Sequence, residues 1–245
     1  MTNVSRRAVI PVLAVGVLAV VLVAASCSQK RPPIAEQIAK TYGLDSFGQI
    51  EAIRYTFNLE VPGLNLSRSW VWEPKTGRVS YEGKDKDGKP VKAAYVRSQL
   101  SSQSDAIKNE IDPAFINDQY WLVFPFHVYW DTSAQVQDMG TQESPLAKRS
   151  AKRVVLKYPS DGGYQPGDTW ELYLGADNRV QEILYRRGGP QPPSLVIATY
   201  EGYKKAGPLL VSTDHTGTAD GKPLRLSLTN VAVRLTGSEA WAEAQ

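Results

Sequence analysis

The chain has very few residues that could form crosslinks or bind a metal. It contains one cysteine, Cys27, and two histidines, His127 and His215, among 245 residues. A single thiol excludes an internal disulfide, so the folded domain must be held together by its own hydrophobic core. Two histidines and no further thiol cannot supply the usual three protein ligands of a catalytic zinc site without carboxylates. We therefore expect neither a metal nor another cofactor.

Sequence motifs for catalysis and for phosphate or calcium binding are also missing. The chain has no Gly-x-Ser-x-Gly elbow, residues 188–193 lack the lysine of a phosphate loop, and residues 84–87 lack the closing glutamate of a calcium loop. His127 and Asp131 are four residues apart, but Pro125 argues against a helical pair there. A serine–histidine–aspartate triad built from distant residues stays open, because triads are recognised by geometry. We expect surface or core histidines and no enzyme.

An excess of charge of one sign is absent as well. The whole chain carries 28 basic and 25 acidic residues, a net charge of +3. Two of the basic residues, Arg6 and Arg7, lie in the N-terminal segment, so the rest of the chain is nearly neutral. No basic run remains that would favour nucleic acid as a partner.

The N-terminus has the three zones of an export signal. Arg6 and Arg7 precede an uncharged apolar run over 8–25, which ends in the letters VAASC. This ending resembles the lipobox of bacterial lipoproteins, and the resemblance implies cleavage after Ser26 and a diacylglycerol on Cys27. The alternative is an uncleaved transmembrane helix, because the run is just long enough to span a bilayer. Both interpretations place the rest of the chain outside the cytoplasm.

We therefore divide the chain into a signal peptide, 1–26, a lipidated cysteine with its tether, 27–33, and one domain, 34–245. Ser28 follows the cysteine, where an aspartate would be an inner-membrane retention signal in enteric-type bacteria. In a host with two membranes we expect the periplasmic face of the outer membrane. The membrane, reached through the lipid anchor, is thus the first expected partner, and we expect a monomer.

Most of the remaining chain predicts antiparallel strands. Over 50–61, Ile53, Tyr55 and Phe57 alternate with polar residues, the period of a half-buried strand. Together with this segment, ten further predicted strands make eleven, near 66–73, 77–82, 90–96, 135–140, 152–158, 168–174, 179–186, 194–203, 209–215 and 222–234.

Two apolar helical segments accompany these strands. Pro33 can begin a helix that carries an apolar stripe and ends at Gly43. In the second segment Asp112 is expected to cap a helix over 115–124, which Pro125 ends or kinks. A long antiparallel sheet curls, and its concave face must be covered. We therefore predict a mainly β (α+β) fold, a single large curved antiparallel sheet of about eleven strands, which is an unclosed β-barrel, with helices plugging its concave face.

This order of elements resembles the LolA and LolB lipoprotein-localisation factors and the mycobacterial lipid-carrying lipoproteins of similar fold. The local matches are 117–125 (NDQYWLVFP) and 166–174 (PGDTWELYL), and the resemblance covers about 34 to 234. It implies an apolar cavity. The residues that could line that cavity are Tyr55, Phe57, Trp70, Trp72, Tyr120, Trp121, Phe124, Trp170, Leu172 and Ile183. The same residues could instead pack as an ordinary core, because aromatic side chains dominate cores.

The leading hypothesis is a non-catalytic, membrane-anchored lipoprotein that binds an apolar ligand, either a lipid or the acyl chains of another lipoprotein. A role in envelope lipid or lipoprotein trafficking would follow. The alternative from a different class is a protein-binding module for envelope assembly or stress sensing, and the third is a hydrolase. A dry cavity would favour the first hypothesis, and a filled core with an exposed apolar patch would favour the second.

Overall fold

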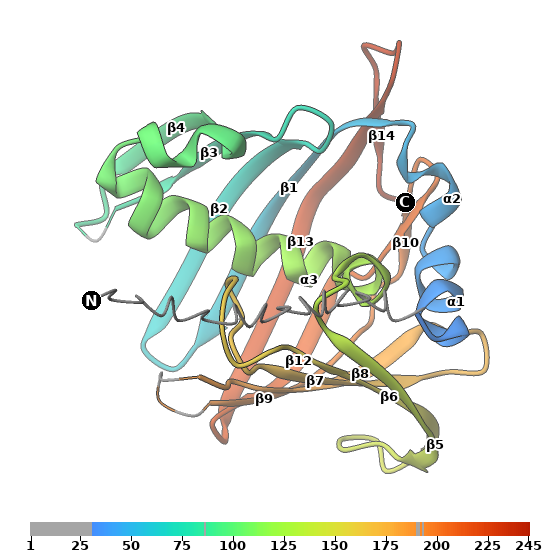
Figure 1. Cartoon of the computed structure of the whole chain (residues 1–245). Helices are drawn as coiled ribbons and strands as arrows, with labels where there is room; N and C mark the ends of the chain where they lie inside the picture. Colours follow the sequence, from blue (N-terminus) through green and yellow to red (C-terminus); the bar gives the residue numbers. More distant parts are fainter. Residues whose placement is uncertain (1–30, 86, 190–191, 193) are drawn as a thin grey trace, which may run out of the picture. The chain divides into compact units, whose positions relative to one another are not determined.

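One antiparallel sheet of twelve strands dominates the structure (Figure 1). The computed structural model describes residues 31–85, 87–189, 192 and 194–245. The expected signal peptide, Cys27 and the start of the tether lie outside these residues. Arg31–Gln245 is one unit with its own core. In the described part of the chain, no helix is long and apolar enough to cross a membrane.

The order of the strands across the sheet differs from their order along the chain. In chain order they are β1 (Ile50–Val61), β2 (Leu64–Glu73), β3 (Arg78–Lys84), β4 (Pro90–Val96), β5 (Gln135–Glu143), β6 (Ser150–Lys157), β7 (Thr169–Leu174), β8 (Val180–Arg186), β9 (Leu195–Thr199), β12 (Asp214–Ala219), β13 (Lys222–Leu235) and β14 (Trp241–Glu243). The spatial order is β4-β3-β2-β1-β13-β12-β9-β8-β7-β6-β5, with β14 beside β13. Since β4 and β5 are separate edges, the sheet is not closed into a barrel, and the predicted fold class is confirmed.

The expected segment 209–215 is not one strand. Its first part is β11 (Leu209–Val211), which pairs with β10 (Lys204–Ala206) in a separate two-stranded sheet. Its last residues begin β12, which joins the main sheet between β9 and β13. The short strands β10 and β14 carry too few residues to show a period in the sequence, so the expected number of eleven strands was too low.

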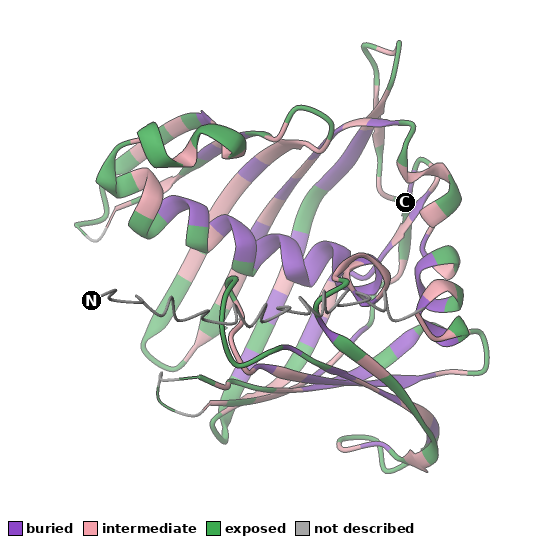
Figure 2. Cartoon of the chain, in the orientation of Figure 1, coloured by how far each residue is buried: buried purple, intermediate pink, exposed green. Residues whose placement is uncertain are grey.

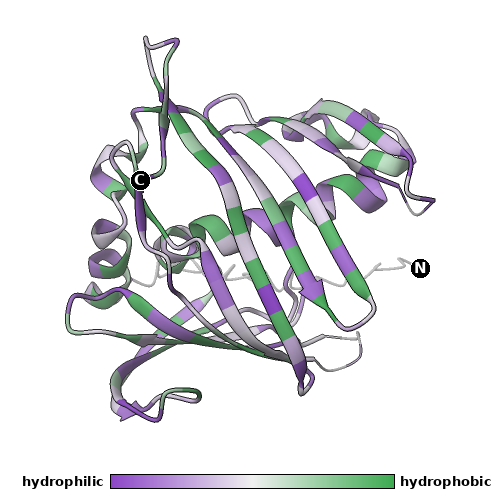
Figure 3. Ribbon diagram, turned by 180° about the vertical axis from the view of Figure 1, so that it is seen from behind, coloured by the Kyte–Doolittle hydropathy of each residue, from purple (hydrophilic) through white to green (hydrophobic). Residues whose placement is uncertain are grey.

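Strand β1 has the predicted alternation. Ile53, Tyr55 and Phe57 are buried, while Arg54 and Thr56 on the other face are partly exposed. Figure 3 shows this outer face, where hydrophobic and hydrophilic positions alternate along the strands. The buried side chains of neighbouring strands therefore meet on the concave side.

The helices are α1 (Pro33–Thr41), α2 (Leu44–Phe47), a 3-10 helix (Arg97–Ser102), a π-helix (Ile107–Ile111) and α3 (Asp112–Trp130). Helix α1 begins at Pro33 as predicted and buries Ile34 and Ile38. Gly43 follows its end with φ of 103°, and a Cβ there would lie 2.5 Å from the Pro208 carbonyl oxygen. Glycine is therefore required at this turn both for its backbone conformation and for space.

Helix α3 is longer than predicted. It does not end at Pro125 but continues to Trp130, with the distortion absorbed at Val123, whose φ and ψ are −120° and 16°. Proline removes one helical hydrogen bond and clashes with the preceding turn, so a kink is expected there. The last turn is held by packing, because the Phe126 ring lies 5.0 Å from the Trp130 ring and 5.1 Å from the Phe47 ring.

Helix α3 lies across the concave face of the sheet (Figure 1). Most of its residues are buried, in contrast to edge strand β5, which is largely exposed (Figure 2). Apolar residues occur on every side of α3, as expected for a helix surrounded by protein. The predicted helical plug of the concave face is therefore present.

Candidate functional site

The N-terminal half of α3 is fastened to the sheet by a buried ion pair. Asp118 is fully buried and accepts hydrogen bonds from Arg68 Nε (2.7 Å) and Trp70 Nε1 (2.8 Å), both on β2. A second bond from Arg68 Nη2 (2.5 Å) makes the pair bidentate. Burial raises the pKa of Asp118 above its ordinary value, although Arg68 and the hydrogen bonds oppose this shift. Each oxygen of this carboxylate is occupied, so the group holds α3 in place.

A second buried carboxylate lies at the start of α3. Asp112 was expected to cap the helix, but the residue before it, Ile111, is already helical, and Asp112 makes no capping bond. Its carboxylate instead accepts hydrogen bonds from Tyr95 (2.9 Å), Arg97 (3.0 Å) and Tyr164 (2.5 Å). The π-helix that runs directly into α3 removes the free helix start that a cap would serve.

The ten residues expected to line a cavity all belong to one hydrophobic cluster. Trp72 is partly buried and the other nine are at most 8 % exposed. They contact one another closely: the Phe124 and Trp170 rings are 4.3 Å apart, and the Trp121 and Trp170 rings are 6.4 Å apart. The structure thus brings the predicted residues together, and within the described chain they pack as a core against α3.

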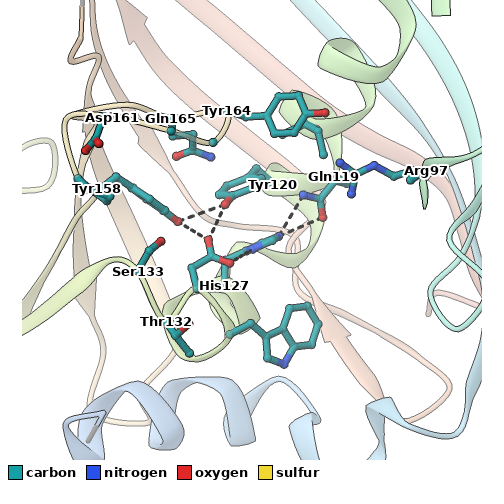
Figure 4. A pocket seen from close by; sticks show the side chains of 16 residues that line it. Arg97, Gln119, Tyr120, His127, Thr132, Ser133, Tyr158, Asp161, Tyr164 and Gln165 are labelled. Carbon is teal, nitrogen blue, oxygen red and sulfur yellow. Dashed lines mark hydrogen bonds and ion pairs between the residues drawn. The ribbon is translucent and has the colours of Figure 1, made fainter. Parts of the chain in front are cut away.

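Helix α3 also borders a pocket of about 570 Å³, with residues from both of its halves (Figure 4). The pocket lies between α3 and the connection from β6 to β7, which reaches up to the helix in Figure 1. Its walls combine aromatic rings, amides, hydroxyls and carboxylates. They are formed by Arg97, Ile116, Gln119, Tyr120, His127, Trp130, Asp131, Thr132, Ser133, Tyr158, Pro159, Asp161, Gly162, Gly163, Tyr164 and Gln165.

Asp131 is the hydrogen-bonding centre of this pocket. Its Oδ2 accepts bonds from the phenols of Tyr120 (2.5 Å) and Tyr158 (2.5 Å), and its Oδ1 lies 3.0 Å from His127 Nδ1. Burial alone would raise the pKa of Asp131, but the bonds from His127 and the two phenols lower it below its ordinary value. Burial and the Asp131 charge raise the pKa of both phenols. The arrangement is therefore an ionised carboxylate with protonated donors.

The contact between His127 and Asp131 corrects the sequence prediction. The two residues form a helical i, i+4 pair because α3 continues beyond Pro125. Asp131 accepts, so Nδ1 carries a proton, and in the neutral ring Nε2 then accepts from the Gln119 amide at 3.0 Å. The imidazole also stacks on the Tyr120 ring, with centroids 3.9 Å apart. Both ring nitrogens of His127 are thus occupied within the pocket wall.

A smaller pocket of about 240 Å³ adjoins the first. The two pockets share four lining residues, Ile116, Tyr120, Tyr164 and Gln165. We call the two pockets together the mouth cleft. Residues 161–165, of which Tyr164 and Gln165 line both pockets, are called the strap. The strap is held at both sides: the Tyr164 hydroxyl donates to Asp112, and the side-chain oxygen Oε1 of Gln165 accepts from Trp170 Nε1 at 2.8 Å.

The other histidine, His215, has a different environment. It is fully buried against the Trp121 and Tyr200 rings, and its Nδ1 lies 3.0 Å from the Thr199 carbonyl oxygen. Burial lowers the pKa of His215 to about 4. In the described chain, no group of three or more His, Cys, Asp and Glu residues is placed to hold a metal ion.

Sequence reasoning missed the residues that close the cleft. Tyr158, Tyr164 and Gln165 belong to a connection between two strands, and the sequence gives no local sign that it returns to α3. Gln119 lies within the match at 117–125, which by itself indicates no role for its side chain. The one usable signal was the four-residue spacing of His127 and Asp131.

Comparisons with known proteins give similarities of structure only. No family model matches the sequence. No curated protein matches it either. A crystal structure of a DUF1329 family protein from Desulfovibrio piger is similar with a TM-score of 0.44 and 9 % identity, covering 84 % of this chain and 93 % of that one. The MucA/MucB complex of Pseudomonas aeruginosa gives a TM-score of 0.22 and 12 % identity, covering 86 % and 96 %. These scores are low, so the function must be argued from this chain's own side chains.

Proposed function

We propose that this chain is a non-catalytic binding protein of the bacterial envelope, anchored to a membrane through Cys27, and that it binds a lipid or lipid-linked molecule in the mouth cleft. The observation that carries the proposal is the pocket of about 570 Å³ beside α3. Ligand pockets typically measure about 300–1,000 Å³ and combine apolar walls with a few convergent polar groups. The larger pocket has this size and this kind of lining.

The position of the ligand differs from that implied by the family resemblance. The space beneath α3 is occupied by packed side chains such as Phe124 and Leu172, both fully buried. Acyl chains could enter there only if α3 moved away from the sheet, which the buried pair of Asp118 and Arg68 opposes. We therefore place the ligand along the side of α3, where Ile116 and Trp130 offer apolar contact.

The geometry around the histidines supports binding rather than catalysis. A nucleophile needs a base within hydrogen-bond reach. The ring nitrogens of His127 are hydrogen-bonded to Asp131 and Gln119. His215 is fully buried against Trp121 and Tyr200. Among the described residues, the hydrogen bonds of these two rings include none from a serine or threonine hydroxyl.

Membrane attachment would place the cleft close to its ligand source. Arg31 donates to the backbone carbonyls of Tyr129 (3.2 Å) and Ala134 (2.6 Å), on either side of pocket residues 130–133. Arg31 follows Cys27 by four residues, and four residues of chain span at most about 14 Å. A lipid on Cys27 would therefore hold the mouth cleft near a membrane surface.

The experiment uses residues 28–245, which keep every contact of the unit Arg31–Gln245. The protein is purified without detergent, its bound lipids are identified by mass spectrometry, and it is titrated with a fluorescent long-chain fatty alcohol, whose head group carries no charge. Ser133→Trp should fill the exposed rim of the cleft and abolish binding of the probe. The control Ser101→Trp, at an exposed site on the 3-10 helix, should leave binding unchanged. If the protein yields no lipid and no probe binds, or if Ser133→Trp binds normally, the proposal is wrong.

A further inference from the structure

The lining of the mouth cleft combines aromatic rings with hydrogen-bonding groups. Tyr120, Trp130, Tyr158 and Tyr164 provide the rings. From the same lining we infer that the polar part of the ligand is a carbohydrate chain, which lies along α3 and passes the strap into both pockets. This inference rests on the proposed function for the location of the site, and it adds the chemical class of the ligand.

The aromatic residues suit a sugar because both partners are amphipathic. A pyranose ring has apolar C–H faces and a rim of hydroxyl groups, and a tyrosine or tryptophan has an apolar face and a polar tip. Tyr164 is 49 % exposed although its hydroxyl is bound to Asp112, so its ring is available to a ligand. Trp130 is partly exposed and lines the larger pocket.

The polar residues suit hydroxyl groups better than hydrocarbon. The Gln119 amide is buried, and its Nε2 and Oε1 lie 3.0 and 3.1 Å from the same His127 nitrogen, which can bond to only one of them. Thr132 and Ser133 add exposed hydroxyls on the rim. Covering such groups with an acyl chain would bury them without partners, at a cost of about 1–3 kcal/mol for each group. Sugar hydroxyls both donate and accept, so they can satisfy every one of these groups.

The charges of the cleft argue against an anionic headgroup. Arg97 is the guanidinium in the larger pocket, and it is already paired with the buried Asp112 at 3.0 Å. Asp131 and Asp161 add negative charge to the same walls. A phosphate or carboxylate in the larger pocket would therefore meet net repulsion, whereas the smaller pocket is lined by both Arg187 and Asp168. A neutral sugar or an amino sugar would not.

The shape of the cleft indicates a chain of several sugars rather than one. Pockets of about 570 and 240 Å³ meet at the strap, and Ile116 and Tyr120 of α3 line both. Trp121, Trp170 and Tyr185 continue the row of aromatic side chains in the smaller pocket. A ligand that fills both pockets must pass Tyr164, so this residue should matter more for long ligands than for short ones.

The test titrates residues 28–245 by calorimetry with soluble, unacylated oligosaccharides. The panel contains disaccharides and hexasaccharides of glucose, mannose and N-acetylglucosamine. We expect saturable binding of at least one hexasaccharide, about tenfold tighter than the matching disaccharide. Gln119→Leu should weaken both lengths about tenfold, because one hydrogen bond is lost and its partner is left unpaired. Tyr164→Ala should weaken the hexasaccharide alone. Gln137→Leu, on exposed strand β5, is the matched control and should change neither.

The outcomes separate this inference from the proposed function. If no oligosaccharide binds but the fluorescent fatty alcohol does, the ligand is apolar, and the carbohydrate inference is overturned while the proposed function stands. If neither class of probe binds, both fail. If an oligosaccharide binds equally well to Gln119→Leu and Tyr164→Ala, it binds elsewhere, and the inference is overturned. Tyr164→Ala changes an exposed side chain, so this arm keeps its meaning even if Gln119→Leu does not fold.

Discussion

The two carboxylates Asp118, in the N-terminal half of α3, and Asp131, next to its C-terminal end, have opposite electrostatic environments. Asp118 in the N-terminal half is fully buried, and burial raises its pKa despite the bidentate arginine. Asp131 just beyond the C-terminal end is partly exposed, and hydrogen bonds from His127 and two phenols lower its pKa. The first group fixes the helix to the sheet, and the second organises a pocket wall. One helix can therefore be fixed to the sheet by some of its side chains and line a ligand-binding cleft with others.

The largest effect should come from breaking the buried pair. Asp118→Ala leaves Arg68 without its partner and Trp70 without an acceptor. Removing one member of a buried ion pair typically costs about 3–5 kcal/mol. We expect a loss of this size in the free energy of unfolding, measured by chemical denaturation. A loss below about 1 kcal/mol would mean that the pair does not hold the helix.

A similar loss is expected at the middle of the helix. Phe124 is fully buried, and its ring lies 4.3 Å from that of Trp170. Phe124→Ala should destabilise the domain by about 3–5 kcal/mol, because it leaves a cavity in the core. The same denaturation assay checks it. A change below about 1 kcal/mol would place Phe124 on a mobile lid and would revive the idea of an open cavity beneath α3.

The next effect is a dependence of stability on pH. His215 has a pKa of about 4 in the folded chain, below its ordinary value of 6.5. Between these values the unfolded chain binds the proton more readily, so stability is complete above pH 6.5 and falls as the pH drops toward 4. The loss should be about 3 kcal/mol. The free energy of unfolding of His215→Phe should fall less steeply between pH 7 and 4 than that of the unaltered chain. An unchanged slope would contradict burial of the neutral ring.

The smallest effect is the difference between Asp131 and Asp118 in how each changes the stability of the domain in acid. The pKa of Asp131 is lowered, so its stabilising contribution is present above the ordinary value of 3.8 and is lost as the pH falls further. The pKa of Asp118 is raised, so its folded form gains stability as the pH falls through the same region. Asp131→Asn should therefore flatten the acid limb of the stability curve, and Asp118→Asn should steepen it. Thermal melts between pH 5 and 3 distinguish these signs, and equal effects would remove the contrast.

Local patterns were sufficient to predict most elements of the fold. The alternation of Ile53, Tyr55 and Phe57 identified β1, and Pro33 with Gly43 bounded α1. Each of these signals arises within a few residues, where period and turn chemistry act directly. The pairing of β1 with β13 has no such signal, because it joins residues far apart in sequence.

The candidate site was predictable only in part, for the same reason. Pro125 argues locally against a helix, but packing of Phe126 against Phe47 and Trp130 keeps the last turn helical, and this brings His127 onto Asp131. Tertiary contacts thus override a local preference. The density of aromatic residues along α3 could not by itself distinguish a packed core from a cavity.

The central claim is that ligands bind at the mouth cleft rather than elsewhere on the domain. Residues 28–245 contain no cysteine, so a single fluorophore can be attached at Thr132→Cys on the rim of the cleft. A second protein carries the same label at Leu64→Cys, an exposed apolar position at the start of β2 that the mouth cleft does not include. Both are titrated with the fatty alcohol and with the hexasaccharide panel. We expect a saturable change of emission at Thr132→Cys only. A response at Leu64→Cys alone would contradict it.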